Sequence, residues 1–553
     1  MSRVVSSRPP EKSLRPEDRS SRGRLLKLAG AVAFVGALVY LPSLNNGFTN
    51  WDDPNYVLQN KHLEPFDGEL LTWAFTTFHM ASWNPLLWLS LGFDRALFGL
   101  EPFGYHLTNV LLHCATTFIV VLVVAALFAR ARSNRDDQNL LPAGVVGLIF
   151  AVHPLHVESV AWVTERKDVL FGVFYVLALL CYVRFAEQHN RTQYRLSLGM
   201  FALALLAKPM AMSLPLVLLI VDAYPLGRLN ELGWRSIVRE KLPFFVLSGA
   251  SLVVTVAAQW GGGAAARHMS TAERFWVAER ALSFYLSKAF LPVDLVPMYP
   301  LNSKISPARW DYIGSLAFVL VVSAVAVFVR RRVPLISALW VAYVAMLLPA
   351  IGVVLGEQAA ADRHMYLPLL VPAIGVVAVA VRFWPRGKSA QAAAMVTAAG
   401  TIVVLAILTV RQTRIWHDSG TLWEWTIAKQ PNAAMAQYNL GEYFREKGDL
   451  DRAGEYWKKA SELETTFSWP LNQLGNLAVQ RGKMDDARSY YERATRVNMN
   501  DAEAQLNYAG FLDDQGQLAE ARLHYQIFLR VVTPELAHMV PEVRQRLSEL
   551  GQP

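Results

Sequence analysis

Apolar runs of about 20 residues, each long enough to cross a bilayer as one helix, recur through the first three-quarters of the sequence. Backbone polar groups cannot stay unsatisfied in lipid, so runs of this kind form helices. Charged residues make up 18% of the 553 residues, below the roughly 25% of soluble domains. The sequence therefore predicts an all-α, polytopic membrane domain with a more polar region appended to it, and it excludes an ordinary soluble enzyme.

We expect about 11 transmembrane helices between residues 25 and 414, after a disordered tail over residues 1–24. The first run is too long for a signal-peptide core and no cleavage site follows it, so we interpret it as an uncleaved span. We interpret Ala281–Leu291 as an amphipathic helix on the membrane surface. The expected spans are 25–44, 106–129, 141–157, 168–186, 195–208, 209–224, 243–260, 311–329, 333–354, 365–383 and 391–410.

The excess of Lys and Arg in alternate loops predicts a cytoplasmic N-terminus, and Arg330–Arg332 is its clearest marker. The long loop 45–105, the loops 154–168 and 355–364, and the chain beyond residue 411 then lie on the outer side. The compact, Ala-rich sequence is typical of bacteria. We therefore expect a multi-pass protein of the bacterial inner (cytoplasmic) membrane whose outer parts face the periplasm, with an organelle lumen as the alternative.

The net charge of +8 is unevenly spread, because the membrane part is basic and the last quarter is mildly acidic. This distribution does not indicate a nucleic-acid partner. Cys114 and Cys181 both lie in apolar runs, which excludes a disulfide framework and a cysteine zinc site.

Three units of 34 residues follow one another at 434–467, 468–501 and 502–535. Their spacing resembles the tetratricopeptide repeat, in which small residues let two helices approach and a glycine turns the chain between them. We expect a solenoid with capping helices over 415–553, which is a binding surface rather than a catalytic site. The matching positions are Gly441, Gly475 and Ala509; Gly448, Gly482 and Gly516; Ala453, Ala487 and Ala521; and Trp457, Tyr491 and Tyr525.

A side-chain amide stands at the sixth position of each unit, at Asn439, Gln473 and Asn507. Amides both donate to and accept from a peptide backbone. A ladder of them could bind an extended acceptor chain whatever its sequence. The alternative is that these amides bond within or between neighbouring repeats.

Two adjacent carboxylates, Asp52 and Asp53, follow the first expected span directly. A carboxylate at this place can take a proton from a substrate hydroxyl. The alternative is that the pair forms a helix N-cap or lies in a solvated loop. The following Pro54 fits the start of a helix. Because the loop 45–105 is rich in Trp and Phe, we expect it to lie on the bilayer as a lid, which suits a lipid-linked substrate.

Further basic and polar residues stand at the outer ends of the expected spans. Charged groups at the membrane boundary are costly and are functional by default, and Arg and Lys commonly bind phosphate; interfacial snorkelling is the alternative. A single short H-x-x-H pattern does not indicate zinc, so we expect no metal site. The candidates for binding a donor phosphate are Arg166, Lys167, Lys208, Arg363 and His364, and those for supporting the site are His153, His156, Glu158 and Tyr366.

Several stretches together resemble one family, the transmembrane-and-tetratricopeptide-repeat O-mannosyltransferases. They are FTNWDDPNYVLQN, HPLHVESVAWVTERKDVL, AADRHMYLP and the junction 416–432 that leads into the repeats. The resemblance covers nearly all of residues 25–535. It implies a membrane domain of the glycosyltransferase C fold, a polyprenyl-phosphate sugar donor, a protein Ser/Thr acceptor and inverting transfer.

The same resemblance implies that the acid pair supplies the base. In related families the pair often reads Asp-Glu and the first acid is the base, which matches Asp52. This chain has Asp-Asp, so the choice between Asp52 and Asp53 stays open. The acceptor would be a periplasmic or secreted protein bound through the repeats, and mannose is one candidate for the sugar.

One base can suffice for such a transfer. Glycoside hydrolysis needs a second carboxylate to protonate its leaving group, whereas a phosphate needs only stabilisation of its charge by Arg and Lys. No cofactor is required, and a divalent metal is not needed. The alternatives are a repeat-bearing scaffold for an envelope complex, a transporter, or a ligase or polymerase of lipid-linked glycans. The outer acids and bases favour an enzyme over a scaffold.

Overall fold

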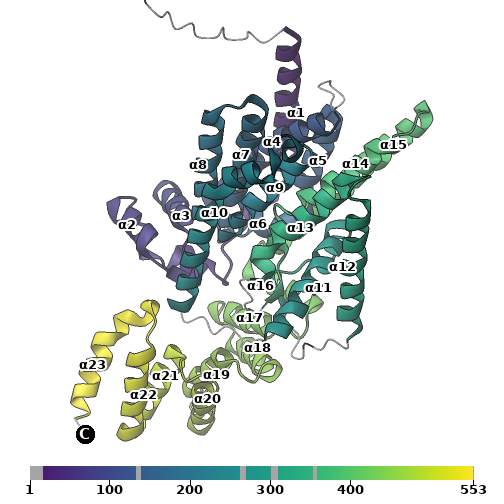
Figure 1. The fold of residues 1–553 in the computed structure, drawn as a ribbon. Coiled ribbons are helices and arrows are strands. Elements are labelled where there is room, and N and C mark those ends of the chain that lie inside the picture. Colours follow the sequence, from purple (N-terminus) through teal and green to yellow (C-terminus); the bar gives the residue numbers. More distant parts are fainter. Residues whose placement is uncertain are drawn as a thin grey trace, which may run out of the picture. The chain divides into compact units, whose positions relative to one another are not determined.

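The structure, a computed structural model, describes residues 16–132, 139–261, 270–300, 305, 309–352 and 358–551. Within these ranges helices dominate (Figure 1), which confirms the expected all-α fold class. The chain forms two compact units, which we describe separately. Unit 1 holds the described residues of 1–46, 57–295 and 302–414, and unit 2 holds those of 47–56, 296–301 and 415–553.

Unit 1 contains the helices α1 to α15 and the strand β2. The helices are α1 Pro16–Tyr40, α2 Gly68–Thr76, α3 Pro85–Phe98, α4 Pro102–Arg132, α5 Leu140–Val152, α6 Val157–Ala161, α7 Arg166–Gln188, α8 Arg191–Ala207, α9 Leu214–Ala223, α10 Arg228–Gly261, α11 Thr271–Phe290, α12 Trp310–Val329, α13 Pro334–Gly352, α14 Leu370–Arg382 and α15 Lys388–Ile415. The short helical segments are η1 Leu41–Asn45, η3 Lys61–Leu63, η4 His79–Ala81, η6 Pro154–His156, η7 Pro209–Ser213 and η8 Asp362–Met365, and β2 is Gln358–Ala360.

Seven helices of the described residues are long and apolar enough to cross a membrane, and the count is eight if the pair α5–α6, bent by 52°, is one span. The chain is therefore a multi-pass membrane protein. Three further expected spans correspond to shorter helices: α8, α14, and η7 with α9. The expected count of about 11 thus stays a prediction. The seven helices are α1, α4, α7, α10, α12, α13 and α15.

The first helix begins earlier than expected. α1 starts at Pro16, so residues 16–24 are helical rather than part of a disordered tail; residues 1–15 lie outside the described part of the chain. α1, α4 and α5 pack against one another. They approach closely at Gly147, where an added Cβ would stand 2.4 Å from Cγ2 of Val121, as small residues allow between membrane helices.

Unit 2 contains the repeats and, in addition, the segment 47–56 that we had expected in the membrane domain. Its helices are α16 Ser419–Lys429, α17 Ala434–Glu446, α18 Leu450–Leu463, α19 Ser468–Gln480, α20 Met484–Val497, α21 Ala502–Asp514, α22 Leu518–Val531, η9 Pro534–Met539 and α23 Val540–Glu549, and β1 is Tyr299–Pro300. The short π-helical turn η2, Pro54–Leu58, begins in the segment 47–56.

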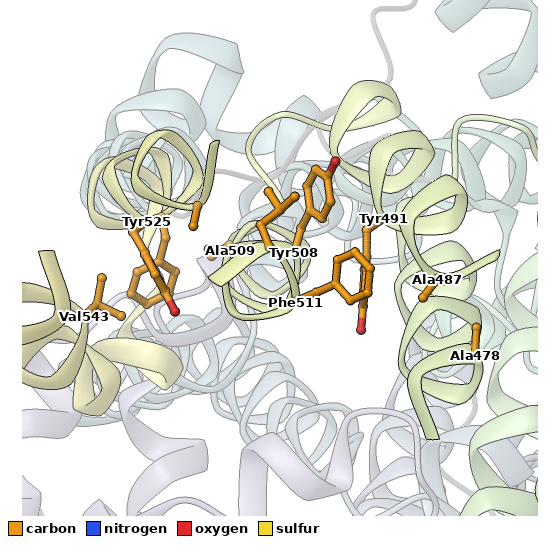
Figure 2. Packing of buried hydrophobic residues seen from close by; sticks show 12 residues of the cluster. Ala478, Ala487, Tyr491, Tyr508, Ala509, Phe511, Tyr525 and Val543 are labelled. Carbon is orange, nitrogen blue, oxygen red and sulfur yellow. The ribbon is translucent and has the colours of Figure 1, made fainter. Parts of the chain in front are cut away.

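Each predicted unit is a pair of antiparallel helices, and the pairs stack in sequence order (Figure 1). The turn glycines Gly448, Gly482 and Gly516 have φ of 79°, 71° and 72°. These values confirm the turn role expected of them, because glycine adopts positive φ without steric cost. The aromatic residues fill the space between helices, as Figure 2 shows for Tyr491 and Tyr525. The repeats are therefore held by side-chain packing along the array.

Candidate functional site

Three separate segments of unit 1 bring six charged side chains together, and we call this group the charge cluster. Four of its members come from α6 and the start of α7, one precedes η7, and one lies in η8. Three carboxylates meet three cations, so the formal charges balance. The members are Glu158, Glu165, Lys167, Asp168, Lys208 and Arg363.

Glu165 lies at the centre of the charge cluster. Its carboxylate is 3.1 Å from Nζ of Lys167, 3.4 Å from Nζ of Lys208 and 3.3 Å from Nε of Arg363. Burial by itself raises the pKa of Glu165, but the three cations outweigh it and lower the pKa well below its usual range. Glu165 therefore stays ionised and holds three cations at one point, beside the N-terminus of α7, where the helix dipole favours anions.

Arg363 joins η8 to α6. Its guanidinium pairs with Glu158, and its backbone N–H donates to Oε2 of the same carboxylate at 2.8 Å. The guanidinium also lies over the ring of Trp162, 5.7 Å from the centroid. Lys208 makes a second link, donating from Nζ to Oδ1 of Asp168 at 2.5 Å. These contacts fix the positions of Arg363 and Lys208, two of the residues predicted to bind phosphate.

His364 lies next to Arg363 in η8 and faces a tyrosine. Its Nδ1 is 2.9 Å from the hydroxyl of Tyr285, and that hydroxyl accepts from the backbone N–H of Ala361 at 3.1 Å. Burial lowers the pKa of His364 well below its usual value, and the cations Arg363 and Lys208 lower it further. His364 is therefore neutral at physiological pH, so it offers a hydrogen bond rather than a charge to a phosphate.

Three of the predicted supporting residues bond to backbone carbonyls or to a buried histidine. His153 donates from Nε2 to the carbonyl of Ala289 at 3.1 Å, and His156 donates from Nδ1 to the carbonyl of Phe150 at 2.8 Å. The hydroxyl of Tyr366 is 3.0 Å from Nδ1 of His113. They thereby support the fold around η6 and η8. Among the described residues no group of three His, Cys, Asp or Glu is arranged to bind a metal, and the predicted lack of a metal requirement stays a prediction.

Arg166 stands apart from the charge cluster. Its Nη1 pairs with Asp94 at 2.7 Å, and its Nη2 donates to the carbonyl of Tyr105 at 2.7 Å. Asn109 and Ser90 accept two further hydrogen bonds from it. The side chain is fully buried. In this arrangement Arg166 joins α7 to α3 and α4, and a phosphate would have to displace its partners.

The acid pair lies in unit 2, where its two members differ. Asp53 is 1% exposed, and its Oδ2 accepts from the backbone N–H of Thr49 at 2.8 Å and from the Thr49 hydroxyl at 3.0 Å. Asp52 is half-buried. Two donors thus bind one carboxylate oxygen of Asp53, and Asp52 is the less buried of the two acids.

The three ladder amides lie on helices α17, α19 and α21. Asn439 is 5% exposed. Oε1 of Gln473 accepts from Asn476 at 3.2 Å, and Nδ2 of Asn507 donates to Asn472 of the preceding repeat at 3.0 Å. These contacts correspond to the alternative that the sequence left open, in which the amides bond within and between repeats. Binding of an acceptor by these residues stays a prediction.

Sequence reasoning did not assign roles to several residues that the structure places here. Glu165 and Asp168 could have been found, because they flank Arg166 and Lys167 in one charged run. Tyr285 gave no signal in its amphipathic helix. Asn50 gave none either, because its partners stand more than 360 residues away in the chain.

Known proteins are similar in sequence to both the membrane part and the repeats of this chain. A family model described as tetratricopeptide repeat matches residues 405–462 and 472–530, which confirms the repeats. Protein O-mannosyl-transferase Tmtc1 of Drosophila melanogaster is 35% identical over 37% of this chain and 24% of its own length. The human TMTC1 and TMTC4 proteins of the same description are each 24% identical, over 82% and 78% of this chain and 58% and 65% of their own lengths. The chain is homologous to the animal protein O-mannosyl-transferases.

The chain spans less than two thirds of these relatives. The two human matches nevertheless extend over most of the present sequence, so the relationship is not confined to the repeats. A solved structure titled "Functional Characterization of Pseudomonas Aeruginosa pilF" aligns with a TM-score of 0.20 and 17% identity, over 42% of this chain and 88% of that chain.

Proposed function

We propose that the protein is a membrane glycosyltransferase that moves a sugar from a polyprenyl-phosphate donor to Ser or Thr of proteins, with inversion at the sugar carbon. The names of its relatives make mannose the first sugar to test. The cellular setting that we propose is a bacterial inner membrane with the repeats in the periplasm. The observation that carries the proposal is the group of three cations around Glu165 in unit 1.

That group suits a phosphate. Lys167, Lys208 and Arg363 are already held together by Glu165, and unlike the fully buried Arg166 their side chains are 15%, 11% and 17% exposed. A phosphate can therefore approach them while Glu165 keeps them together. Charge-assisted hydrogen bonds of this kind are about twice as strong as neutral ones. Preorganised cations also stabilise the charge that develops on a departing phosphate. The charge cluster thus supports the role of donor-phosphate site for three of the five residues predicted for it.

A lipid-linked donor also needs an apolar site for its chain. Unit 1 has a cavity of about 140 Å³ between α4, α7, α9, α13 and α14, lined almost wholly by apolar side chains. Its lining includes Leu367, which stands four residues after Arg363, and reaches Phe128 in α4. An isoprenoid chain is the occupant that this lining favours in a membrane enzyme.

The reaction that we propose needs one proton acceptor. The acceptor hydroxyl oxygen forms a bond to the sugar carbon, and the bond from that carbon to the phosphate oxygen breaks. The electron pair of the broken bond leaves with the phosphate, and the hydroxyl proton passes to a carboxylate. We assign that carboxylate to Asp52, because its side chain is half-buried whereas Asp53 is 1% exposed. The repeats would bind the acceptor protein.

A transfer assay tests this proposal. We expect purified full-length protein to move radiolabelled mannose from polyprenyl-phosphate mannose to a Ser/Thr peptide. Asp52→Asn should lower kcat by about 10²–10⁴, the usual contribution of general-base catalysis. It should leave the melting temperature nearly unchanged, because this side chain is only half-buried.

Asp53→Asn is the matched control, since an amide oxygen can still accept from Thr49. It should keep most of the activity. No transfer from this donor, or from the same lipid carrying another hexose, would refute the proposed function. Normal turnover of the Asp52 variant together with loss in the Asp53 variant would reverse the two roles.

A further inference from the structure

The segment 47–56, which carries the acid pair, is anchored within unit 2 by a series of hydrogen bonds. The backbone N–H of Gly47 donates to the carbonyl of His417 at 2.9 Å. Three residues further, the backbone N–H of Asn50 donates to the hydroxyl of Ser419 at 2.8 Å. The segment therefore contacts the start of α16, the helix that precedes the first complete repeat.

Asn50 makes the most specific of these contacts with its side chain. Its Oδ1 accepts from Nε1 of Trp423 in α16 at 2.7 Å, and its Nδ2 donates to the carbonyl of Asn439 in α17 at 2.9 Å. An indole N–H can only donate and a carbonyl can only accept, so the amide fits in one orientation. Asn50 thereby bridges two successive helices of the array.

The residues beside Asn50 complete the anchor. The ring of Trp51 meets the ring of Trp423 edge to face, with centroids 5.3 Å apart, and Trp423 is fully buried. On the other side, Asp53 bonds back to the backbone and hydroxyl of Thr49. Asp52 therefore lies between two restrained neighbours, one held by the repeats and one held by the segment itself.

We infer that α16 and α17 position the proton-accepting carboxylate, and that Asn50 is the positioning residue through which they act. The inference rests on the function proposed for Asp52. It gives the start of the repeat array a role in the chemical step besides any role in binding an acceptor. It follows that the array matters even for an acceptor too short to occupy the repeats.

The size of the effect follows from the geometry. Displacement of a catalytic group by about 1 Å can lower a rate about 10²-fold. Asn50→Ala removes both side-chain bonds, and Trp423→Phe removes one of them while it keeps an aromatic ring. With a short Ser/Thr peptide we expect kcat to fall about 10–100-fold in the first variant and less in the second. KM for donor and peptide should stay within about twofold, because neither residue lies in the charge cluster.

Trp457→Phe is the matched control, since Trp457 is another buried tryptophan of the repeats and none of its described contacts is with the segment 47–56. It should leave kcat unchanged. Hydrogen exchange on the full-length protein gives a second readout that needs no turnover. Asn50→Ala should speed the exchange of amides in 47–53 and leave those of α19 to α22 as they are.

The outcomes separate this inference from the proposed function. A wild-type protein without transferase activity refutes the function, while the exchange experiment still tests the anchor. An active wild type whose Asn50→Ala variant keeps full kcat and slow exchange overturns the inference and leaves the function standing. An equal loss of kcat in the Trp457→Phe control also overturns it, because the effect would then be general destabilisation of the repeats.

Discussion

His364 and the cations around it illustrate how unit 1 controls ionisation one residue at a time. Glu165 is kept charged by Lys167, Lys208 and Arg363, whereas burial together with those cations keeps His364 neutral. A carboxylate and an imidazole close together in one unit thus have their pKa values lowered by the same positive charges. Glu165 and His364 are therefore each kept in one protonation state across the neutral range.

His364 gives a prediction about pH. Its folded pKa is lowered, so the unfolded chain takes up a proton first as pH falls below about 6.5. The stability that neutral His364 contributes is fully present above that pH and is lost as pH falls toward the folded pKa. The loss is at most about 1.4 kcal/mol per pH unit for one group.

Thermal unfolding of wild type and His364→Gln at pH 7.5 and pH 5.5 checks this. The wild type should lose more stability between the two values than the variant, because glutamine keeps a hydrogen-bond acceptor but does not titrate. Tyr285→Phe serves as a comparison that removes the hydroxyl contact and leaves the imidazole. An equal loss in wild type and His364→Gln would contradict the prediction.

At the level of elements, helix pairs in the repeats depend on glycines that admit an aromatic ring. A Cβ at Gly475 of α19 would stand 2.6 Å from Cε1 of Tyr491 in α20. The ring cannot move away easily, because its hydroxyl donates to Oδ1 of Asn476 at 2.6 Å. The close approach of α19 and α20 thus depends on glycine, which has no side chain, at position 475.

Gly475→Ala should therefore destabilise the protein by about 1–3 kcal/mol, the usual cost of overpacking. Thermal unfolding of the full-length chain measures this. Gly510→Ala is the control within the same array, since an added Cβ at Gly510 meets nothing within 4 Å. It should be neutral or slightly stabilising, because alanine has the higher helix propensity. Equal melting temperatures for the two variants would show that the ring of Tyr491 can give way.

On the scale of the whole molecule, unit 1 is stabilised by a second charged network, which shares no residue with the charge cluster. Arg228 pairs with Asp222 at 2.9 Å and with Glu240 at 2.8 Å, and Lys241 contacts the same two acids. The hydroxyl of Tyr182 donates to Asp222 at 2.6 Å. This network joins α7, α9 and α10, with its two acids and two bases in balance.

Removing one base leaves one negative charge uncompensated in the interior, because Arg228 alone then faces both acids. Lys241→Ala should destabilise the protein by about 3–5 kcal/mol, because Lys241 and Asp222 are both fully buried. Arg130→Ala, which breaks an exposed pair with Glu187, should change stability by about 1 kcal/mol or less. Unfolding in detergent measures both. Similar small losses in the two variants would mean that water reaches the network.

Local patterns in the sequence determined the helical membrane part and the three repeats. Apolar runs and a 34-residue period are short-range properties, and a helix forms wherever its own residues favour it and can bury one face. The turn glycines Gly448, Gly482 and Gly516 belong to the same class, since φ is a property of the residue itself. The charged ends of the spans were also visible, although their partners were not.

Only the tertiary structure decided how those charged residues pair. Arg166 looked like Lys167 in the sequence, yet it is buried against Asp94 while Lys167 joins Glu165. Asp52 and Asp53 are adjacent acids in the sequence, yet Asp52 is half-buried while Asp53 is 1% exposed and bonds to Thr49. The physical reason is that an ion pair or hydrogen bond depends on distance in space, and helix packing brings together groups far apart in the chain. A sequence pattern records which groups are present, whereas burial and approach select which of them meet.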